Sequence, residues 1–66
     1  MTLGERMLSY RARHRISQTK LAELIGETQN VIHIIETGKH RPHKANEMRL
    51  SAKMQELEEK ERKGEE

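Results

Sequence analysis

Helix-capping residues divide the middle of the chain into two short helices. Ser17 and Thr28 are residue types that cap helix N-termini through a side-chain oxygen, and each precedes a run with helical apolar spacing. Gly26 and Gly38 stand where the two runs end, and glycine adopts the left-handed backbone of a helix C-cap at the least cost. Only a tight turn separates the two predicted helices, which run over about 18–25 and 29–37.

Two further helices are predicted on either side of this pair. Thr2 and Glu5 have the spacing of a capping box. This pattern predicts a first helix over about 3–14. From about Ala45 onward no glycine interrupts the chain before Gly64, which predicts a prolonged last helix.

Apolar residues recur at helical spacing in all four predicted helices, which gives each helix one face for a core. In chain order, these faces comprise Leu3, Met7 and Tyr10; Leu21, Ala22 and Ile25; Ile32 and Ile35; and Leu50, Met54 and Leu57. Tyr10 is the only aromatic residue, so the core consists of small and aliphatic side chains, which suit packed helices better than a sheet. The 66 residues make a single all-α domain. We expect its core over about 2–57 and a charged C-terminal helix or tail over about 58–66.

The amino-acid composition argues against several classes of protein. The chain contains no cysteine, which excludes disulfides and thiolate metal sites. No segment approaches the roughly 20 apolar residues that span a membrane, and the N-terminus lacks the apolar stretch of a signal peptide. No Ser-His-Asp, Cys-His or paired-carboxylate arrangement stands out. We therefore expect a cytoplasmic protein that is not an enzyme, needs no cofactor and has no evident small-molecule effector.

Charge is distributed unevenly along the chain. Residues 1–44 carry eight Lys and Arg against four Glu, a balance of +4, and they contain all four histidines. Residues 45–66 carry five against seven, a balance of −2. A basic body with an acidic tail fits a polyanionic partner for the body. A mixed solvated surface is the alternative.

The charged run from Glu56 to Lys63 has its own pattern. Glutamates precede basic residues by four positions at Glu56/Lys60, Glu58/Arg62 and Glu59/Lys63. Such pairs stabilise a helix by about 0.2–0.5 kcal/mol each. The run is therefore predicted to be a solvated helix face.

The stretch from Leu3 to Pro42 resembles the XRE or Cro/repressor-type helix-turn-helix family of phages, plasmids and bacterial chromosomes. The matching features are Leu3-Gly4-Glu5-Arg6, Arg11, Ile16-Ser17-Gln18, Leu21-Ala22, Ile25-Gly26, Ile32, Ile35-Glu36, Gly38-Lys39 and Arg41-Pro42. The resemblance implies a lambda-repressor-like bundle of four or five helices with a central helix-turn-helix. It also implies a transcriptional repressor that binds a two-fold operator in double-stranded DNA as a homodimer.

The resemblance also implies roles for individual residues. Gln18 resembles the family's glutamine that contacts a phosphate and braces the recognition helix. At the head of that helix, Thr28, Gln29 and Asn30 occupy the main base-reading positions, and Gln and Asn pair with adenine. The implied contacts further along are His33 and Ile34 on the helix, with Lys39 and Arg41 as phosphate clamps.

Several residues have competing interpretations. Ile34 lacks a hydrogen-bonding group, so we expect it to touch a thymine methyl group or to read nothing, and Val31 could do the same. Arg11 and Glu36 match positions that often form a structural ion pair in the family. Lys20 and Lys44 are weaker phosphate candidates.

Assembly is the least constrained feature. The apolar fifth helix that relatives commonly use for dimerisation is replaced here by Gln55 to Glu66, which is rich in Glu and Lys. Leu50, Met54 and Leu57 are tentative dimer-contact residues. Burial in the chain's own core is the competing interpretation for the same three side chains.

Two alternatives concern function. His33, His40 and His43 suggest a metal site, but a structural site usually needs four ligands, so solvated or phosphate-contacting histidines are favoured. The same fold could also serve as a protein-interaction module, such as an antitoxin or a coactivator-like adaptor. In that case the acidic last helix would be the docking segment.

Overall fold

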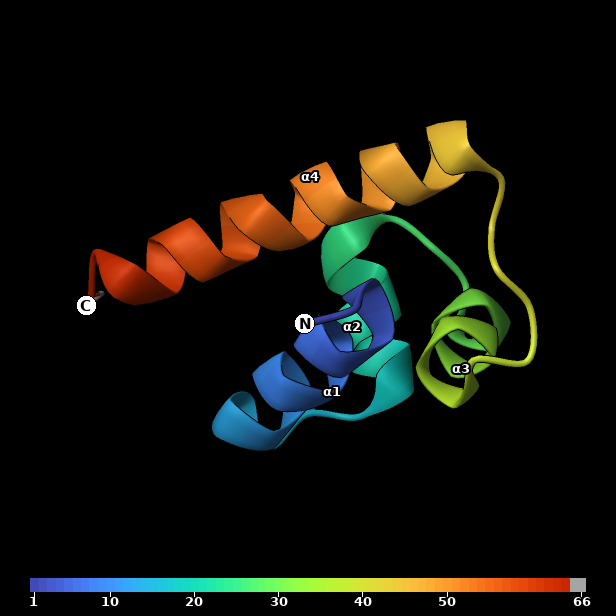
Figure 1. The fold of residues 1–66 in the computed structure, drawn as a ribbon. Coiled ribbons are helices and arrows are strands. Elements are labelled where there is room, and N and C mark those ends of the chain that lie inside the picture. The colour runs from blue at the N-terminus through green and yellow to red at the C-terminus, as the bar shows by residue number, and fades with distance from the viewer. Residues whose placement is uncertain (65–66) are drawn as a thin grey trace.

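The computed structural model describes residues 1–64, so residues 65–66 of the expected charged tail lie outside the described part. Four α-helices follow one another: α1 (Leu3–His14), α2 (Gln18–Ile25), α3 (Gln29–Thr37) and α4 (Lys44–Arg62). The first three helices pack together, and α4 runs across α1 and α2 (Figure 1). The predicted all-α bundle is confirmed with four helices, of which the last is the longest. No helix in residues 1–64 has both the length and the apolar character to cross a membrane.

Side-chain caps begin the first three helices as predicted. The Thr2 hydroxyl accepts from the backbone N–H of Glu5 at 3.1 Å, and the Glu5 carboxylate accepts in return from the backbone N–H of Thr2 at 2.8 Å. Ser17 and Thr28 cap α2 and α3 through their hydroxyl oxygens. Because these contacts join residues three apart, they are encoded locally, and the predicted boundaries of α1, α2 and α3 are confirmed.

The first three helices end in left-handed backbone, but only two of these three C-caps are glycines, and α4 ends at Lys63 in right-handed backbone. Gly26 and Gly38 end α2 and α3 with φ values of 73° and 74°. Arg15 ends α1 with a φ of 54°, and it is the only non-glycine residue with a positive φ among residues 1–64. Although no glycine follows α1, its turn has the same left-handed C-cap as those of α2 and α3, because Arg15 adopts that conformation at a higher free-energy cost than glycine would.

The predicted apolar faces form the core. Buried side chains come from all four helices: Leu3, Met7, Tyr10, Leu21, Ala22, Ile25, Ile32, Ile35, Leu50 and Met54. Leu57 is half-buried and packs against this cluster, as do Ile16 and Val31. The buried-face prediction is thus confirmed for every residue except Leu57, which keeps one side in solvent.

The end of α4 is only in part the predicted solvated face, because Glu56, Lys60, Arg62 and Lys63 are exposed whereas Glu58 and Glu61 face α1. None of the three expected i,i+4 pairs forms within the described residues. Instead, Glu58 accepts from Arg6 at 2.8 Å, and Glu61 accepts from Arg13 at 2.6 Å. The last turns of α4 are therefore fastened to α1 by ion pairs that join residues about 50 positions apart.

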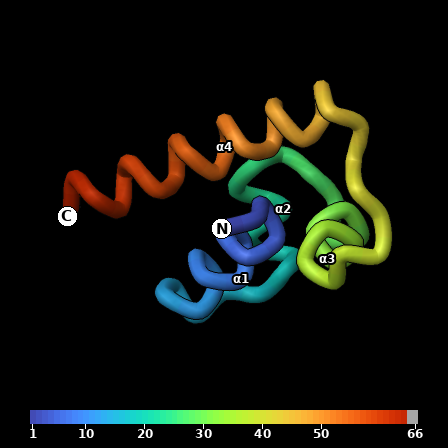
Figure 2. The backbone as a smooth tube through the Cα atoms, in the orientation of Figure 1, coloured from blue at the N-terminus to red at the C-terminus, as the bar shows by residue number. Residues whose placement is uncertain are grey.

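The bundle has two distinct ends. In Figure 2, α3 and the connection from α3 to α4 form one side of the molecule, and the C-terminal end of α4 projects on the opposite side. The long dimension is 34 Å, against 22 and 21 Å for the other two. A surface centred on α3 is therefore well separated from the charged end of α4.

Candidate nucleic-acid interface

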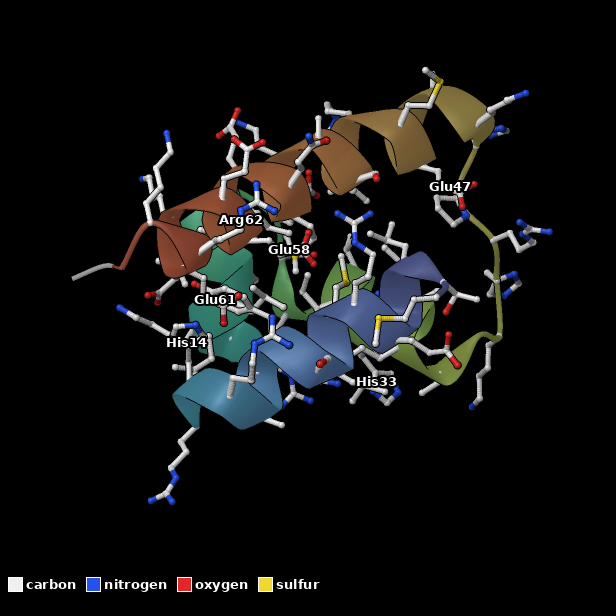
Figure 3. The ribbon with its side chains drawn as sticks, turned by 60° about the vertical axis from the view of Figure 1, so that its left-hand side comes forward. His14, His33, Glu47, Glu58, Glu61 and Arg62 are labelled. Carbon is white, nitrogen blue, oxygen red and sulfur yellow. The ribbon has the colours of Figure 1, made fainter. Side chains whose placement is uncertain are left out.

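The head of α3 is open to solvent. Thr28, Gln29 and Asn30 are exposed, and His33 is exposed one turn further along. Figure 3 shows His33 at the edge of the molecule that faces away from α4. The residues expected to read bases therefore occupy one accessible helix surface, because positions 29 and 30 lie one turn before position 33.

Gln29 is held in place by Gln18 of the preceding helix. The Gln29 Nε2 donates to Gln18 Oε1 at 2.6 Å, although the two residues are eleven positions apart. A glutamine amide has two N–H donors and one carbonyl acceptor. Gln29 thus keeps one donor and its acceptor free for another partner. This is the donor-acceptor pair that matches N7 and N6 of adenine.

Gln18 is fixed in turn by Glu36. The Gln18 Nε2 donates to Glu36 Oε1 at 2.9 Å, and the Arg11 guanidinium donates to both carboxylate oxygens at 2.8 and 2.9 Å. The predicted Arg11–Glu36 ion pair is confirmed. A continuous hydrogen-bonded series therefore runs from α1 through Glu36 and Gln18 to Gln29 at the head of α3.

The carboxylate at the centre of this series is charged although its side chain is only 4 % exposed. Burial by itself raises the pKa of Glu36, but hydrogen bonds from Arg11 and Gln18 outweigh burial and lower the pKa below its ordinary value. The hydrogen bond to Glu36 also raises the pKa of Arg11. Both groups are therefore ionised at neutral pH, which makes each the counter-charge of the other.

An apolar groove lies beside α3. Val31 and Ile34 are half-buried and line it together with Ile35, Pro42 and Leu50. Glu27 and Arg49 also line this groove, and they are joined by an ion pair of 2.6 Å. Ile34 is therefore neither in the core nor fully exposed, and its contact with a thymine methyl group stays a prediction.

The connection between α3 and α4 is basic and exposed. Lys39, His40, Arg41 and His43 are all exposed, and Lys44 begins α4. The Arg41 side chain is 88 % exposed and approaches Glu47 only at 4.0 Å. These residues thus place cations next to the C-terminal end of α3. Lys20, the weaker candidate at the start of α2, is exposed as well.

The tentative dimer-contact residues have another role. Leu50 is 2 % exposed and Met54 is not exposed at all, because both pack in the chain's own core. Their side chains are therefore unavailable to a second copy, and the core interpretation holds for these two. Leu57 alone keeps a partly exposed side chain.

Metal coordination has no geometric support in the described part of the chain. No three His, Asp or Glu side chains in it converge as a metal site requires. The spacing of His33, His40 and His43 is therefore not accompanied by convergence in space.

Sequence reasoning missed the role of Arg6. Its guanidinium donates to the Ser51 hydroxyl at 2.7 Å and to both oxygens of Glu58, which joins α1 to two positions of α4 about two turns apart. The available signal was its place one residue before Met7, on the flank of the buried stripe. An arginine there can lay its stem along apolar surface and reach a neighbouring helix.

Comparison with protein-family models, with curated proteins and with solved structures finds no match to this chain. The functional interpretation therefore rests on the residues and on the geometry of the molecule.

Proposed function

We propose that this protein is a sequence-specific DNA-binding transcriptional regulator whose helix α3, beginning after Thr28, enters the major groove. The observation that carries the proposal is the Gln18–Gln29 hydrogen bond, which leaves an exposed amide with one donor and one acceptor free. A side chain fixed before binding loses less conformational freedom when it pairs with a base. Gln29 and its neighbour Asn30 are thus the principal base-reading residues.

Cations beside α3 support the same proposal. Lys39 and Arg41 follow the helix directly and are exposed, so they are suited to phosphate contacts that fix the protein on the duplex. Gln18 and His33 supply further polar contacts on the same surface, with Lys20 and Lys44 at its margins. Ile34 and Val31 offer apolar contacts of the kind that thymine methyl groups make.

The proposed mode of action is repression from a two-fold operator. Two copies would place their recognition helices in successive major grooves, about 34 Å apart. A protein that occupies such a site blocks polymerase. The setting that fits this role is the cytoplasm of a bacterial cell, with the operator on chromosomal, phage or plasmid DNA.

The apolar groove favours one other candidate. Val31, Ile34 and Pro42 line a half-open surface of a size that suits an apolar side chain of another protein. A protein-interaction module, such as an antitoxin or an adaptor, would use this surface without any affinity for DNA.

Titration against random-sequence duplex DNA at several salt concentrations separates the two candidates. A regulator binds at low salt and loses affinity steeply as salt rises, because counterions are released from the phosphates. Lack of any affinity at low salt would contradict the DNA-binding proposal. Operator selection followed by footprinting then supplies the specific site and the half-site spacing.

The substitution Gln29→Ala tests base reading. We expect affinity for the selected operator to fall about 5- to 150-fold, which corresponds to the 1–3 kcal/mol of a bidentate base contact, while affinity for random DNA changes little. Gln55→Ala is the matched control, since Gln55 is an exposed glutamine on α4. Equal losses of affinity for operator and for random DNA would mean that Gln29 contacts the DNA backbone and reads no base.

A further inference from the structure

Three of the four histidines belong to the segment from α3 to the start of α4. His33 lies on α3, and His40 and His43 lie on the connection to α4. All three are exposed, and none has a hydrogen bond or ion pair within the described residues. His14 differs, because its Nε2 lies 2.7 Å from Glu61 and its ring stacks on Tyr10 at 4.2 Å. Figure 3 shows His14 beside Glu61 and well apart from His33.

The carboxylates near these imidazoles already have cationic partners. Glu36, whose charge interacts with His33, is bound by Arg11 at 2.8 Å. Two other carboxylates line the grooves that His40 borders, and each faces an arginine: Glu27 with Arg49 at 2.6 Å and Glu47 with Arg41 at 4.0 Å. The remaining charged neighbours along the chain are the cations Lys39 and Lys44. The two carboxylates held at short distance, Glu36 and Glu27, are thus already neutralised by arginines, and a proton on an imidazole adds positive charge to this surface.

We propose that protonation of His33, His40 and His43 makes DNA binding proton-dependent, with three imidazolium groups adding phosphate contacts to those of Lys39 and Arg41. The imidazole side chain changes its charge between about pH 5 and 8. An added cation at a phosphate releases a condensed counterion, which tightens binding and steepens its salt dependence. The proposal rests on the DNA-binding function and specifies how that same surface is regulated.

The proposal predicts how much the salt dependence of DNA binding changes on protonation. Each phosphate contact contributes about 0.9 to the slope of log affinity against log salt. Three imidazolium contacts therefore steepen the slope by up to about 2.7. At about 0.1 M salt, each contact raises affinity by up to about eightfold through counterion release.

The experiment measures binding of the full chain to a random-sequence duplex across a salt series at about pH 8, 7 and 6. Thermal unfolding at each pH shows whether the fold is retained. We expect tighter binding and a steeper slope at about pH 6 than at about pH 8. The triple variant His33→Gln, His40→Gln, His43→Gln is expected to lose this response. His14→Gln is the matched control and is expected to keep it, since His14 lies beside Glu61, away from α3.

A second variant covers the case in which a change on α3 disturbs folding. His40→Gln with His43→Gln leaves α3 untouched and is expected to retain about one third of the change in slope, because one of three imidazoles remains. A slope that is the same at every pH would overturn the proposal while the DNA-binding function stands. A pH response that survives the triple substitution, or that His14→Gln abolishes, would overturn it too. Lack of binding at every pH and at low salt would instead overturn the DNA-binding function itself.

Discussion

Glu36 serves two purposes with one buried carboxylate. Its Oε2 accepts from Arg11, while its Oε1 accepts from both Arg11 and Gln18. A nearly buried carboxylate is costly unless it is paired and hydrogen-bonded, so the three bonds are what make the charge tolerable. The same bonds fix Gln18, which fixes Gln29. Fold stability and the geometry of the proposed reading surface therefore depend on one residue.

Removal of the Glu36 charge should destabilise the fold. In Glu36→Gln the Arg11 guanidinium keeps its charge without a counter-charge, at a cost of about 2–3 kcal/mol, since its side chain is partly open to solvent. Urea unfolding monitored by circular dichroism measures the loss. Glu23→Gln, an exposed change on α2, should stay within about 0.5 kcal/mol of the parent. Equal unfolding free energies for the two variants would show that the ion pair contributes nothing.

The same carboxylate predicts a pH dependence of stability. The pKa of Glu36 is lower in the folded chain than its ordinary value of 4.5. A group with a lowered folded pKa stabilises the fold fully above its unfolded pKa and loses that contribution as the pH falls through the folded value. We therefore expect the stability gap between the parent and Glu36→Gln to stay constant from about pH 7 to 5 and to narrow below pH 4.5. Urea unfolding at each pH tests this, and a gap that widens in acid would contradict it.

The approach of α1 to α3 depends on the absence of a side chain at Gly4. A Cβ placed there would lie 2.5 Å from the carbonyl oxygen of Ile35 and 3.3 Å from the Cα of Glu36. Both atoms belong to the backbone of α3, so relief would require the whole helix to move. Since α3 also carries Gln29, the spacing of these two helices helps to set where the proposed reading residues stand.

The substitution Gly4→Ala therefore has two opposing effects on stability: a gain in helix propensity and a loss from overpacking against α3. Propensity alone would stabilise the helix by up to about 1 kcal/mol, whereas overpacking against backbone costs about 1–3 kcal/mol. We expect a net loss of about 1–2 kcal/mol in the free energy of unfolding, with packing the larger effect. Ala12→Gly, at an exposed position of α1, reports the propensity effect in the same helix. A more stable Gly4→Ala variant would contradict the close approach.

The ion pairs at the end of α4 predict where this helix frays. Glu58 accepts two hydrogen bonds from Arg6, and both side chains are half-buried. Glu58→Ala should cost about 1 kcal/mol, at the upper end for partly exposed pairs, and should speed amide hydrogen exchange in the last two turns. Glu56→Ala is the control, because Glu56 is exposed and has no partner in the described residues. Identical exchange in the two variants would mean that Arg6 does not hold the helix end.

Local and long-range features differ in how far the sequence predicts them. The caps at Ser17 and Thr28 and the glycines at 26 and 38 act within four residues, so the boundaries of α2 and α3 followed from the sequence. The sequence did not predict Arg6 as the partner of Glu58. Arg62 is always within reach along the helix, but Arg6 offers two hydrogen bonds in a half-buried setting that exists only once α1 and α4 have packed. The link from Gln18 to Glu36 was missed for the same reason.

The whole molecule separates its charges between two ends. Lys39 and Arg41 lie on the connection that follows α3. Glu58 and Glu61, labelled in Figure 3, pair with Arg6 and Arg13 of α1 near the end of α4. The acidic residues at that end thus neutralise cations that do not belong to the proposed interface. Cations next to α3 stay available, so the modest formal net charge of +2 understates the positive charge of that surface.

This separation of charge predicts which cations contribute to DNA binding. Lys39→Gln with Arg41→Gln should reduce the slope of log affinity against log salt by about 1.8, since each phosphate contact contributes about 0.9. Lys53→Gln with Lys60→Gln removes the same charge from exposed positions of α4 and should leave the slope nearly unchanged. Both variants have the same net charge, so a difference between them reports position alone. Equal reductions of the slope would mean that DNA responds to the total charge of the chain and not to the cations beside α3.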